Sequence, residues 1–350
     1  MPHGVLLCHV LPIFFHCAFL QCVQAGKVAN PKLGQNAQYH AGLLLKINLK
    51  LNGINLMSPA SKGGLQLLRE KPTIVFGVDV NHAAPGSSKP SFSALVASMD
   101  AECARYYSVV GAQEPRKELV DLEGKVRKCL RQYKEKNGTA PQRIIFFRDG
   151  VANNQFNNEC NSEISDIRRA AFNEGGADYV PELIYIVVQQ RTRARLASID
   201  QGNRVKPRQD GNVPVGTVID TDIVSLPPNG QQPNNWYLVA HYGLKGTCRP
   251  THYHVLANDT QASLEAMERL VFDLCFLYAR ATKVVSRPAP VYYAHRAAFL
   301  AQYYEPNYRE INDQWETGST ASTGSGGSGS HLSIPEIRLN NKAASTVFWA

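Results

Sequence analysis

Two aspartates lie inside stretches of sequence that are otherwise almost entirely apolar. Asp79 belongs to the run TIVFGVDV at 73–80, and Asp149 ends the run RIIFFRD and precedes Gly150. An unpaired carboxylate is costly among apolar side chains, so each acid needs a partner such as a cation or a hydrogen-bond donor. If the two runs form neighbouring strands, the acids could together hold two magnesium ions. One ion would activate water and the other would stabilise the leaving oxygen of a phosphodiester.

Structural roles for the same residue types stay open at this point. An acid at the end of a strand can cap a helix, form a turn or make one half of an ion pair. A further group, Cys248, His252 and His254, resembles the spacing of a zinc site. Because it lacks a fourth ligand, it fits an ordinary strand better than a structural zinc centre.

The elements that must position the two aspartates alternate between strands and helices. Apolar runs at 73–80, 143–151 and 183–190 predict strands covered on both faces. The spacing of apolar residues in 117–136 predicts an amphipathic helix. Further strands are expected at 92–100, 106–113, 216–224, 236–242 and 252–256, and further helices up to about 173, at 263–280 and at 295–303. This order predicts an α/β fold with a mixed central sheet flanked by helices.

Composition and charge favour a folded protein with a polyanionic partner. The chain has 350 residues, of which 44% are hydrophobic, enough to fill a sizeable core, and its formal net charge is +8. Its eight cysteines include no CxxC pair, which fits reduced thiols in the cytoplasm, with a nuclear location also open. The apolar run 5–20 lacks the cationic start and cleavage site of a signal peptide, and we expect a buried or atypical segment and no membrane association.

One segment near each end of the chain has a distinctive sequence pattern. The run AGLLLKINLKL at 41–51 suits a helix or a strand, and in either case Lys46 and Lys50 share a face. The stretch TGSTASTGSGGSGS at 317–330 has no apolar anchor, so we expect a mobile loop there.

Six ordered blocks of sequence resemble the Piwi domain of eukaryotic Argonautes. They are VDVNHAAPG at 78–86, SMDAECARY at 98–106, RIIFFRDGVANNQF at 143–156, YIVVQQR at 185–191, GTCRPTHYHVL at 246–256 and RPAPVYYAHRAAF at 287–299. Six blocks in order are far more specific than any one of them. The resemblance implies an RNase H-like fold and a guide-directed, magnesium-dependent endoribonuclease, in which manganese could replace magnesium.

The same resemblance implies a catalytic tetrad of Asp, Glu, Asp and His. In this sequence the positions are Asp79, Glu118, Asp149 and His295, of which Asp79, Asp149 and His295 would hold the metal. Glu118 is chosen over Glu114 and Glu123 because of its Arg-Lys-Glu context, and it would close the site once guide and target are in place. An ion pair or a surface position is the alternative role for each.

The resemblance also implies a second set of residues, which would bind the guide. Segments 20–24 and 43–53 resemble the end of the Argonaute Mid domain, whose Gln and two Lys grip the 5′ phosphate of the guide. The positions expected to contact the guide are Gln21, Lys46, Lys50, Arg191, His241, Arg249, Arg280, Ser286 and Tyr292. Two departures weaken the phosphate pocket, because Leu300 and Gln302 stand where relatives have basic residues. Arg296 could compensate.

The extent of the resemblance predicts the organisation of the chain. We expect an atypical segment at 1–19, a partial Mid domain at 20–57, a linker at 58–71 and the Piwi domain at 72–350. Complete Argonautes have N-terminal, Paz and full Mid regions before this point, so the resemblance implies a shortened product or an incomplete gene model.

The expected partners are a guide RNA, a target RNA and a tryptophan-rich silencing protein. Two alternatives stay open, a fragment that binds guide RNA or a protein partner without cutting and a remnant that does not fold stably.

Overall fold

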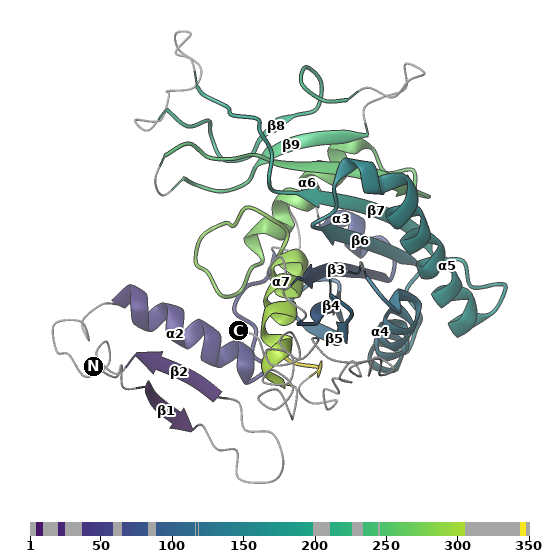
Figure 1. Ribbon diagram of the computed structural model, residues 1–350, viewed down its shortest axis with the longest axis horizontal. Helices are drawn as coiled ribbons and strands as arrows, with labels where there is room; N and C mark the ends of the chain where they lie inside the picture. The colour runs from purple at the N-terminus through teal and green to yellow at the C-terminus, as the bar shows by residue number, and fades with distance from the viewer. Residues whose placement is uncertain are drawn as a thin grey trace, which may run out of the picture.

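A mixed sheet of eight strands forms the centre of the molecule (Figure 1), as the alternation of strands and helices predicted. The order of its strands is β5-β4-β3-β6-β7-β10-β9-β8. Their bounds are β3 (Thr73–Asn81), β4 (Ser91–Ser98), β5 (Tyr106–Gln113), β6 (Arg143–Asp149), β7 (Glu182–Gln189), β8 (Thr217–Ile219), β9 (Asn235–Val239) and β10 (Thr251–Asn258). The computed structural model describes residues 5–9, 20–24, 37–58, 65–82, 89–115, 117, 119–198, 211–225, 234–243, 246–304 and 344–347.

Strand pairing brings the two apolar runs that carry the aspartates side by side. β3, β4 and β5 form the expected antiparallel meander, while β6 runs parallel to both β3 and β7. Val78 pairs with Arg148, so Asp79 and Asp149 come next at the same level of two adjacent strands. Both therefore lie at the carboxyl ends of parallel strands, where α/β proteins place their sites.

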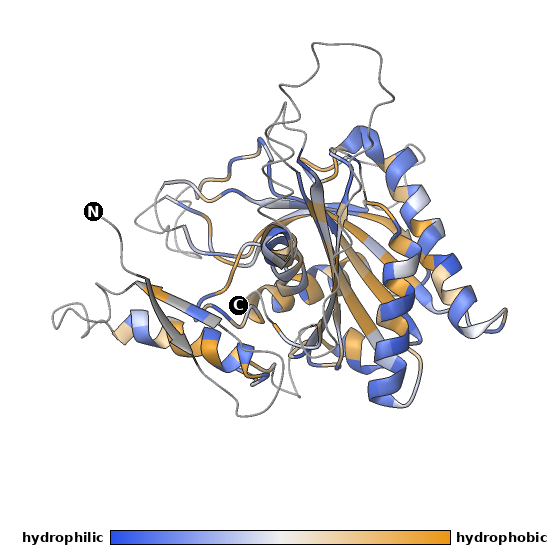
Figure 2. Ribbon diagram, turned by 60° about the horizontal axis from the view of Figure 1, so that its bottom comes forward, coloured by the Kyte–Doolittle hydropathy of each residue, from blue (hydrophilic) through white to orange (hydrophobic). Residues whose placement is uncertain are grey.

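Helices cover both faces of the sheet, which explains why its central strands are apolar throughout. α4 (Leu122–Asn137) and α5 (Asn161–Gly175) pack on one face, where the Phe146 ring lies 5.2 Å from Tyr185 and 5.7 Å from Phe76. α6 (Leu264–Phe276) and α7 (Ala289–Ala301) cover the other face. Figure 2 shows apolar strands between helices whose outer faces are polar.

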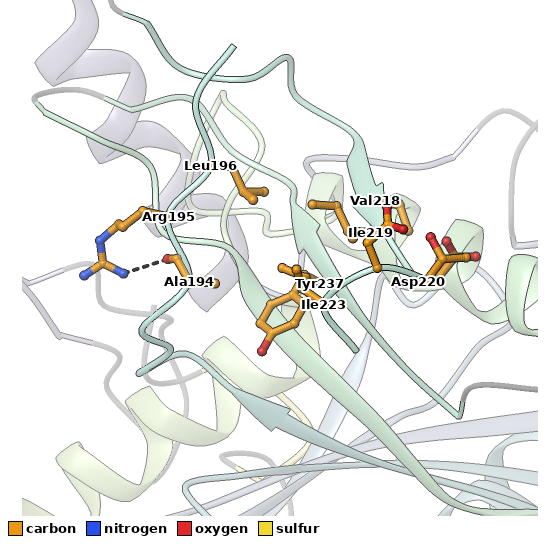
Figure 3. A pocket seen from close by; sticks show the side chains of 10 residues that line it. Ala194, Arg195, Leu196, Val218, Ile219, Asp220, Ile223 and Tyr237 are labelled. Atoms are coloured by element: carbon orange, nitrogen blue, oxygen red, sulfur yellow. Dashed lines mark hydrogen bonds between the residues drawn. The ribbon is translucent and has the colours of Figure 1, made fainter. Parts of the chain in front are cut away.

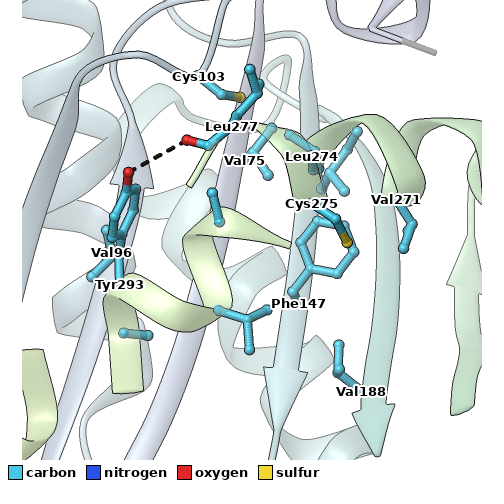
Figure 4. Packing of buried hydrophobic residues seen from close by; sticks show 14 of the residues in the cluster. Val75, Val96, Cys103, Phe147, Val188, Val271, Leu274, Cys275, Leu277 and Tyr293 are labelled. Carbon is cyan, nitrogen blue, oxygen red and sulfur yellow. Dashed lines mark hydrogen bonds between the residues drawn. The ribbon is translucent and has the colours of Figure 1, made fainter. Parts of the chain in front are cut away.

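Tyr293 ties α7 to the loop that follows α6. Its buried hydroxyl donates to the Leu277 carbonyl, as Figure 4 shows, and accepts from the Ala279 amide at 3.0 Å. The ring packs against Tyr106 of β5, with centroids 4.8 Å apart. Since α7 also carries His295, these contacts fix the height of that histidine above the sheet.

The N-terminal part of the chain forms a separate small unit beside the main sheet (Figure 1). β1 (Val5–His9) and β2 (Leu20–Gln24) form a two-stranded antiparallel sheet, and α2 (Ala37–Lys50) follows. The segment 41–51, for which helix and strand were both open, is thus mainly helical. The Asn55 amide joins this unit to the main body by donating to the carbonyls of Leu45 and Ala279 at 2.8 and 2.9 Å.

Several predicted boundaries differ from the observed ones. The helix expected at 117–136 begins at Leu122, the helix expected at 295–303 begins at Ala289, and the helix expected at 263–280 ends at Phe276. The helical stretch before 173 consists of a 3-10 turn at Asn153–Gln155, a π-helical turn at Phe156–Cys160 and α5, and a further 3-10 turn, Gln302–Tyr304, follows α7. Within the segment predicted as a linker, α3 (Gln66–Arg69) brings the buried Leu67 and Leu68 against the core.

The loop predicted at 317–330 lies outside the described residues. Within the described part of the chain, no helix combines the length and the apolarity that a membrane span requires.

Candidate active site and nucleic-acid interface

Asp79 and Asp149 line the same cleft at the carboxyl ends of β3 and β6. The cleft has a volume of about 950 Å³, and His295 and Arg191 contribute to its walls. The two aspartates are only 8% and 7% exposed, so their carboxylates face the cleft from a largely buried position. Gly150 follows with φ +84°, and a Cβ added there would lie 3.6 Å from Asp79 Oδ1. A side chain at 150 would therefore narrow the space beside Asp79.

Asp79 is oriented by two hydrogen bonds. Its Oδ2 lies 2.7 Å from Nδ1 of His295, and its Oδ1 accepts from the Val80 amide at 2.9 Å. His295 stands on α7, and 49% of its side chain is exposed to the cleft and to solvent. The predicted pair of Asp79 and His295 is thus brought together from elements 216 residues apart.

Asp149 has a different partner, the guanidinium of Arg287. Nη1 of Arg287 donates to Asp149 Oδ2, and the guanidinium lies 4.4 Å from the centre of the Tyr292 ring. Burial raises the pKa of Asp149, the charge of Arg287 opposes that shift, and the nearby Asp79 carboxylate adds to it; the net direction is upward. Sequence reasoning did not single out Arg287.

A buried network fixes the backbone on which Asp149 lies. Arg148 is almost fully buried, donates to the Asp149 carbonyl at 2.6 Å and pairs with Glu163 of α5 at 2.9 Å. Beyond Gly150, the Gln189 amide donates to the Val151 carbonyl at 2.9 Å. The loop after β6 is therefore held from both sides, which limits the movement of the Asp149 carboxylate.

The donor atoms in the cleft fit a divalent cation better at Asp79 than at Asp149. Adjacent ligands of octahedral Mg²⁺ lie about 3 Å apart, because each bond is about 2.0–2.1 Å long. Asp79 Oδ2 and His295 Nδ1 are 2.7 Å apart, close to that spacing. At Asp149 the guanidinium of Arg287 already supplies a positive charge. Within the described residues, no three His, Cys, Asp or Glu side chains are grouped tightly enough to hold a metal ion.

Two other predicted features stand apart from this arrangement. Glu118 lies outside the described residues, so its place relative to Asp79 and Asp149 stays a prediction. The ring centres of His252 and His254 lie 3.9 Å apart with the rings tilted by 52°, and their Nε2 atoms face Asn235 and Gln189 at 2.9 and 3.2 Å. These amide contacts occupy the two histidines, so their arrangement is that of packed strand side chains.

A second cluster, of basic side chains, forms where α2 meets the α6–α7 region. Burial lowers the pKa of Lys46, and the charges of Arg280 and Arg296 lower it further. Burial and Arg280 likewise lower the pKa of Arg296. In the described part of the chain, no carboxylate pairs with any of these three cations. Such a partly buried group of like charges favours an anion as its ligand.

Comparison with known proteins identifies the family to which this fold belongs. The model of the Piwi domain family matches residues 15–305. The chain belongs to the Argonaute family. It is 39% identical over 342 residues to Protein argonaute 5 of Arabidopsis thaliana, covering 92% of this chain and 33% of that protein. It is also 39% identical to Protein argonaute 1D of Oryza sativa subsp. japonica, covering 84% of this chain and 29% of that protein. It therefore spans about a third of the length of these curated relatives.

Solved Argonaute structures share the fold. The C-terminal lobe of a budding yeast Argonaute has a TM-score of 0.74 at 26% identity, covering 89% of this chain and 61% of that one. Kluyveromyces polysporus Argonaute with a guide RNA has the same TM-score and identity, covering 91% of this chain and 37% of that one. The Piwi domain described here thus has the predicted RNase H-like fold.

The residues expected to contact a guide fall into separate groups on this Argonaute. Lys50 donates to Gln21 at 3.0 Å, beside the cluster that contains Lys46 and Arg280. Ser286 and Tyr292 share a hydrogen bond of 2.7 Å next to Arg287. The remaining ones are the exposed Arg191 at the cleft and His241 and Arg249 in the connection between β9 and β10.

An extended segment of the Argonaute chain adds two basic residues that sequence reasoning missed. Along 191–198 the residues alternate between exposed and half-buried, so Arg193 and Arg195 are exposed with Arg191. Arg195 donates to the Ala194 carbonyl at 2.7 Å and borders a cavity of about 580 Å³ beside β8 and β9 (Figure 3). The alternation R-T-R-A-R was the signal that could have identified them.

Proposed function

We propose that this chain acts as a guide-directed endoribonuclease, which hydrolyses the RNA strand paired to a short guide RNA. The observation that carries the proposal is the pair of carboxylates, Asp79 and Asp149, at adjacent strand ends in one cleft with His295 on Asp79. The solved relative with a guide RNA, at 26% identity, makes RNA the substrate class to test.

The proposed chemistry assigns a part to each side chain in the cleft. Asp79, Asp149 and His295 would hold magnesium or manganese, with Glu118 as the fourth member of the tetrad. In a two-metal mechanism, the bound ions would activate water and stabilise the leaving oxygen. The Val80 amide keeps the Asp79 carboxylate turned toward the cleft. Arg148 restrains the main chain at Asp149, and Gly150 leaves room beside Asp79 for the scissile phosphate.

A cleavage assay tests this proposal. The full chain would be loaded with a 5′-phosphorylated guide RNA, given Mg²⁺ or Mn²⁺ and mixed with a labelled complementary RNA. We expect one cut in the target, which Asp79→Asn reduces at least about a hundredfold. His252→Asn, which alters a buried amide contact outside the cleft, serves as a folding control. An uncut target with either metal, at a guide concentration that saturates binding, would rule the proposal out.

Guide binding would use the basic cluster of Lys46, Arg280 and Arg296. Its members lie together without a carboxylate partner in the described chain, as a site for a terminal phosphate requires. Arg296 lies one helical turn before Leu300, so it could supply the charge that Leu300 lacks.

The preference for a 5′ phosphate tests this part of the proposal. We expect a phosphorylated guide to bind at least about tenfold tighter than the same RNA with a 5′ hydroxyl. Arg296→Met should remove most of that difference, whereas Arg131→Met on the outer face of α4 should leave it intact. Equal affinity for both RNAs would contradict this use of the cluster.

A second candidate function is guide or partner binding without cleavage. It is favoured by the ion pair between Arg287 and Asp149, which neutralises one proposed metal ligand, and by Leu300 and Gln302 in place of basic residues. This function predicts that wild type and Asp149→Asn bind a guide equally and that neither cuts. Cleavage by the wild type that Asp149→Asn abolishes would exclude it.

The tryptophan-rich silencing partner would need an apolar surface on the Piwi domain. A cavity of about 200 Å³ between α5 and β7 offers one, and the exposed side chains of Phe172 and Val180 lie at its edge. We expect a peptide with spaced tryptophans to bind the chain and Phe172→Ser to weaken that binding. The same peptide with alanine in place of tryptophan is the control, and equal binding of both peptides would exclude this partner class.

A further inference from the structure

We propose that Arg287 is an internal competitor for the divalent cation at Asp149, so that a metal ion gains this carboxylate only when the ion pair opens. This inference rests on the proposed nuclease function, because it concerns the metal site of that function. Arg287 would set both the affinity of the cleft for metal ions and the number of ions that bind there.

Arg287 is placed to act in this way because it is buried at the cleft and not free in solvent. It is 7% exposed, lines the cleft and donates from Nη1 to Asp149 Oδ2. Pro288 follows it directly and precedes the first residue of α7, which restrains the main chain at this position. The planar guanidinium is pre-organised, so it loses less entropy when it forms the ion pair, which favours the paired state.

Neighbouring side chains hold the guanidinium in place. Its carbon lies 4.4 Å from the centre of the Tyr292 ring, a cation–π contact. The Tyr292 hydroxyl shares a hydrogen bond of 2.7 Å with Ser286, and Ser286 accepts from the Gln190 amide at 3.2 Å. The chain of contacts from Gln190, just after β7, through Ser286 and Tyr292 thus supports the paired position of Arg287.

The charge of Arg287 changes what the cleft can bind. Asp79 and Asp149 together carry two negative charges, and Arg287 reduces their sum by one. A divalent ion and a guanidinium on the same carboxylate repel each other strongly where water is scarce. Because affinity for hard cations rises with the charge of the ligand set, the ion pair should weaken metal binding.

His295 and Arg287, the partners of the two aspartates, would respond differently when a metal ion binds. The side chain of His295 is 49% exposed, and an imidazole nitrogen is itself a ligand for metal ions, so His295 can share a cation with Asp79. Arg287 cannot be deprotonated in a protein, so it has to move away from Asp149. The first ion should therefore bind on the side of Asp79 and His295, and a second ion should bind only against the competition of Arg287.

Metal titration of the full chain without RNA tests the inference. Mn²⁺ binding would be measured by isothermal titration calorimetry and by electron paramagnetic resonance, which counts free ions. We expect Arg287→Met to bind Mn²⁺ at least about tenfold tighter than wild type or to bind an additional ion. Arg287→Lys keeps the positive charge but loses the planar guanidinium on Tyr292, so it should gain less Mn²⁺ affinity than Arg287→Met.

Two controls separate local competition from other effects. Arg191→Met removes a positive charge from an exposed position in the same cleft, and it should change the affinity by less than about threefold because exposed charges are screened. The double variant Asp149→Asn with Arg287→Met removes both charges of the pair. Neither partner of the Arg287–Asp149 pair is then left as an unpaired buried charge, so the double variant should fold, and it should lose the gain in Mn²⁺ affinity.

The outcomes distinguish this inference from the proposed function. Unchanged Mn²⁺ binding in Arg287→Met, or an equal gain in Arg191→Met, would overturn the inference even if the wild type cuts RNA. If Arg287→Met is poorly stable without metal, its melting temperature should rise more with Mn²⁺ than that of wild type, and an equal rise would also overturn it. A gain in Mn²⁺ affinity without RNA cleavage by any variant would support the inference and count against the nuclease function.

Discussion

At the scale of single residues, the two aspartates of the cleft occupy equivalent positions but have different partners. Asp79 faces an exposed histidine, while Asp149 faces a buried arginine. The pair is therefore asymmetric in charge before any ligand binds. This asymmetry predicts that substitutions of the two aspartates differ in their effect on stability, because only Asp149→Asn leaves a buried cation without its partner.

Glu268 gives a prediction for stability that is independent of the cleft. It is buried on α6 with Oε1 unpaired, and burial, together with Asp220 and Glu265, raises its pKa to about 7. The folded state thus holds a proton that the unfolded state loses near pH 4.5, so stability falls as pH rises from about 4.5 to about 7. Glu268→Gln should remove this loss and be more stable than wild type at pH 8 by about 1–2 kcal/mol.

Urea unfolding at pH 5 and pH 8 measures the effect of Glu268. Glu265→Gln is a matched control, because Glu265 lies on the same helix with 78% of its side chain exposed. If the unfolding free energies of wild type and Glu268→Gln differ by the same amount at pH 5 and at pH 8, Glu268 has an ordinary pKa.

Residue patterns predicted some members of the cleft and not others. Asp79 and Asp149 stood out because a charge inside an apolar strand requires a partner. His295 was assigned only through the family resemblance, since nothing local marks it. The ion pair of Arg287 joins residues 138 positions apart, and only the packing of the α6–α7 loop against β6 brings them together. No periodicity in the sequence encodes such a contact.

At the scale of elements, the site depends on how closely α7 approaches β3. A Cβ added to Gly77 of β3 would lie 2.3 Å from the backbone of Pro290 at the start of α7. Gly77→Ala should therefore push α7 away from the sheet and separate His295 from Asp79. We expect a loss of about 1–3 kcal/mol in the free energy of unfolding, measured with urea, together with weaker Mn²⁺ binding.

Gly111→Ala is the matched control for Gly77→Ala. It adds the same methyl group in β5, where the new Cβ would lie at ordinary contact distance, 3.4 Å from the end of the Lys125 side chain and 3.7 Å from Ser93 Oγ. Its stability should stay close to that of wild type. Equal stability of the two variants would contradict the close packing of α7 on β3.

The central strands were predicted more accurately than the ends of the helices, whereas the strand expected at 216–224 is only the short β8, Thr217–Ile219. The apolar runs of β3, β6 and β7 are continuous because both faces of the sheet are covered, and such runs are evident in the sequence. Helix ends depend on local caps. α4 begins after Asp121, whose side chain accepts from the Gly124 amide, and α7 begins with a proline in its first turn. Apolar spacing alone contains neither signal.

At the scale of the whole molecule, the net charge of +8 and the basic cluster predict that guide binding depends on salt. The logarithm of guide affinity should fall linearly with the logarithm of salt concentration. Lys46→Met should reduce the slope by about 0.7 if it removes one contact to a single-stranded phosphate. Lys134→Met, at an exposed position on α4, should leave the slope unchanged, whereas equal slopes for wild type and Lys46→Met would exclude Lys46 from the RNA interface.

The position of the cut in a target RNA tests the proposed function most directly. Two guides that pair with the same target one nucleotide apart would be loaded separately, and the products mapped at single-nucleotide resolution in Mg²⁺. We predict that the cut moves by one nucleotide with the guide and that Asp79→Asn and Asp149→Asn both abolish it. A cut that stays in place when the guide moves, or that persists in both variants, would contradict guide-directed hydrolysis at this site.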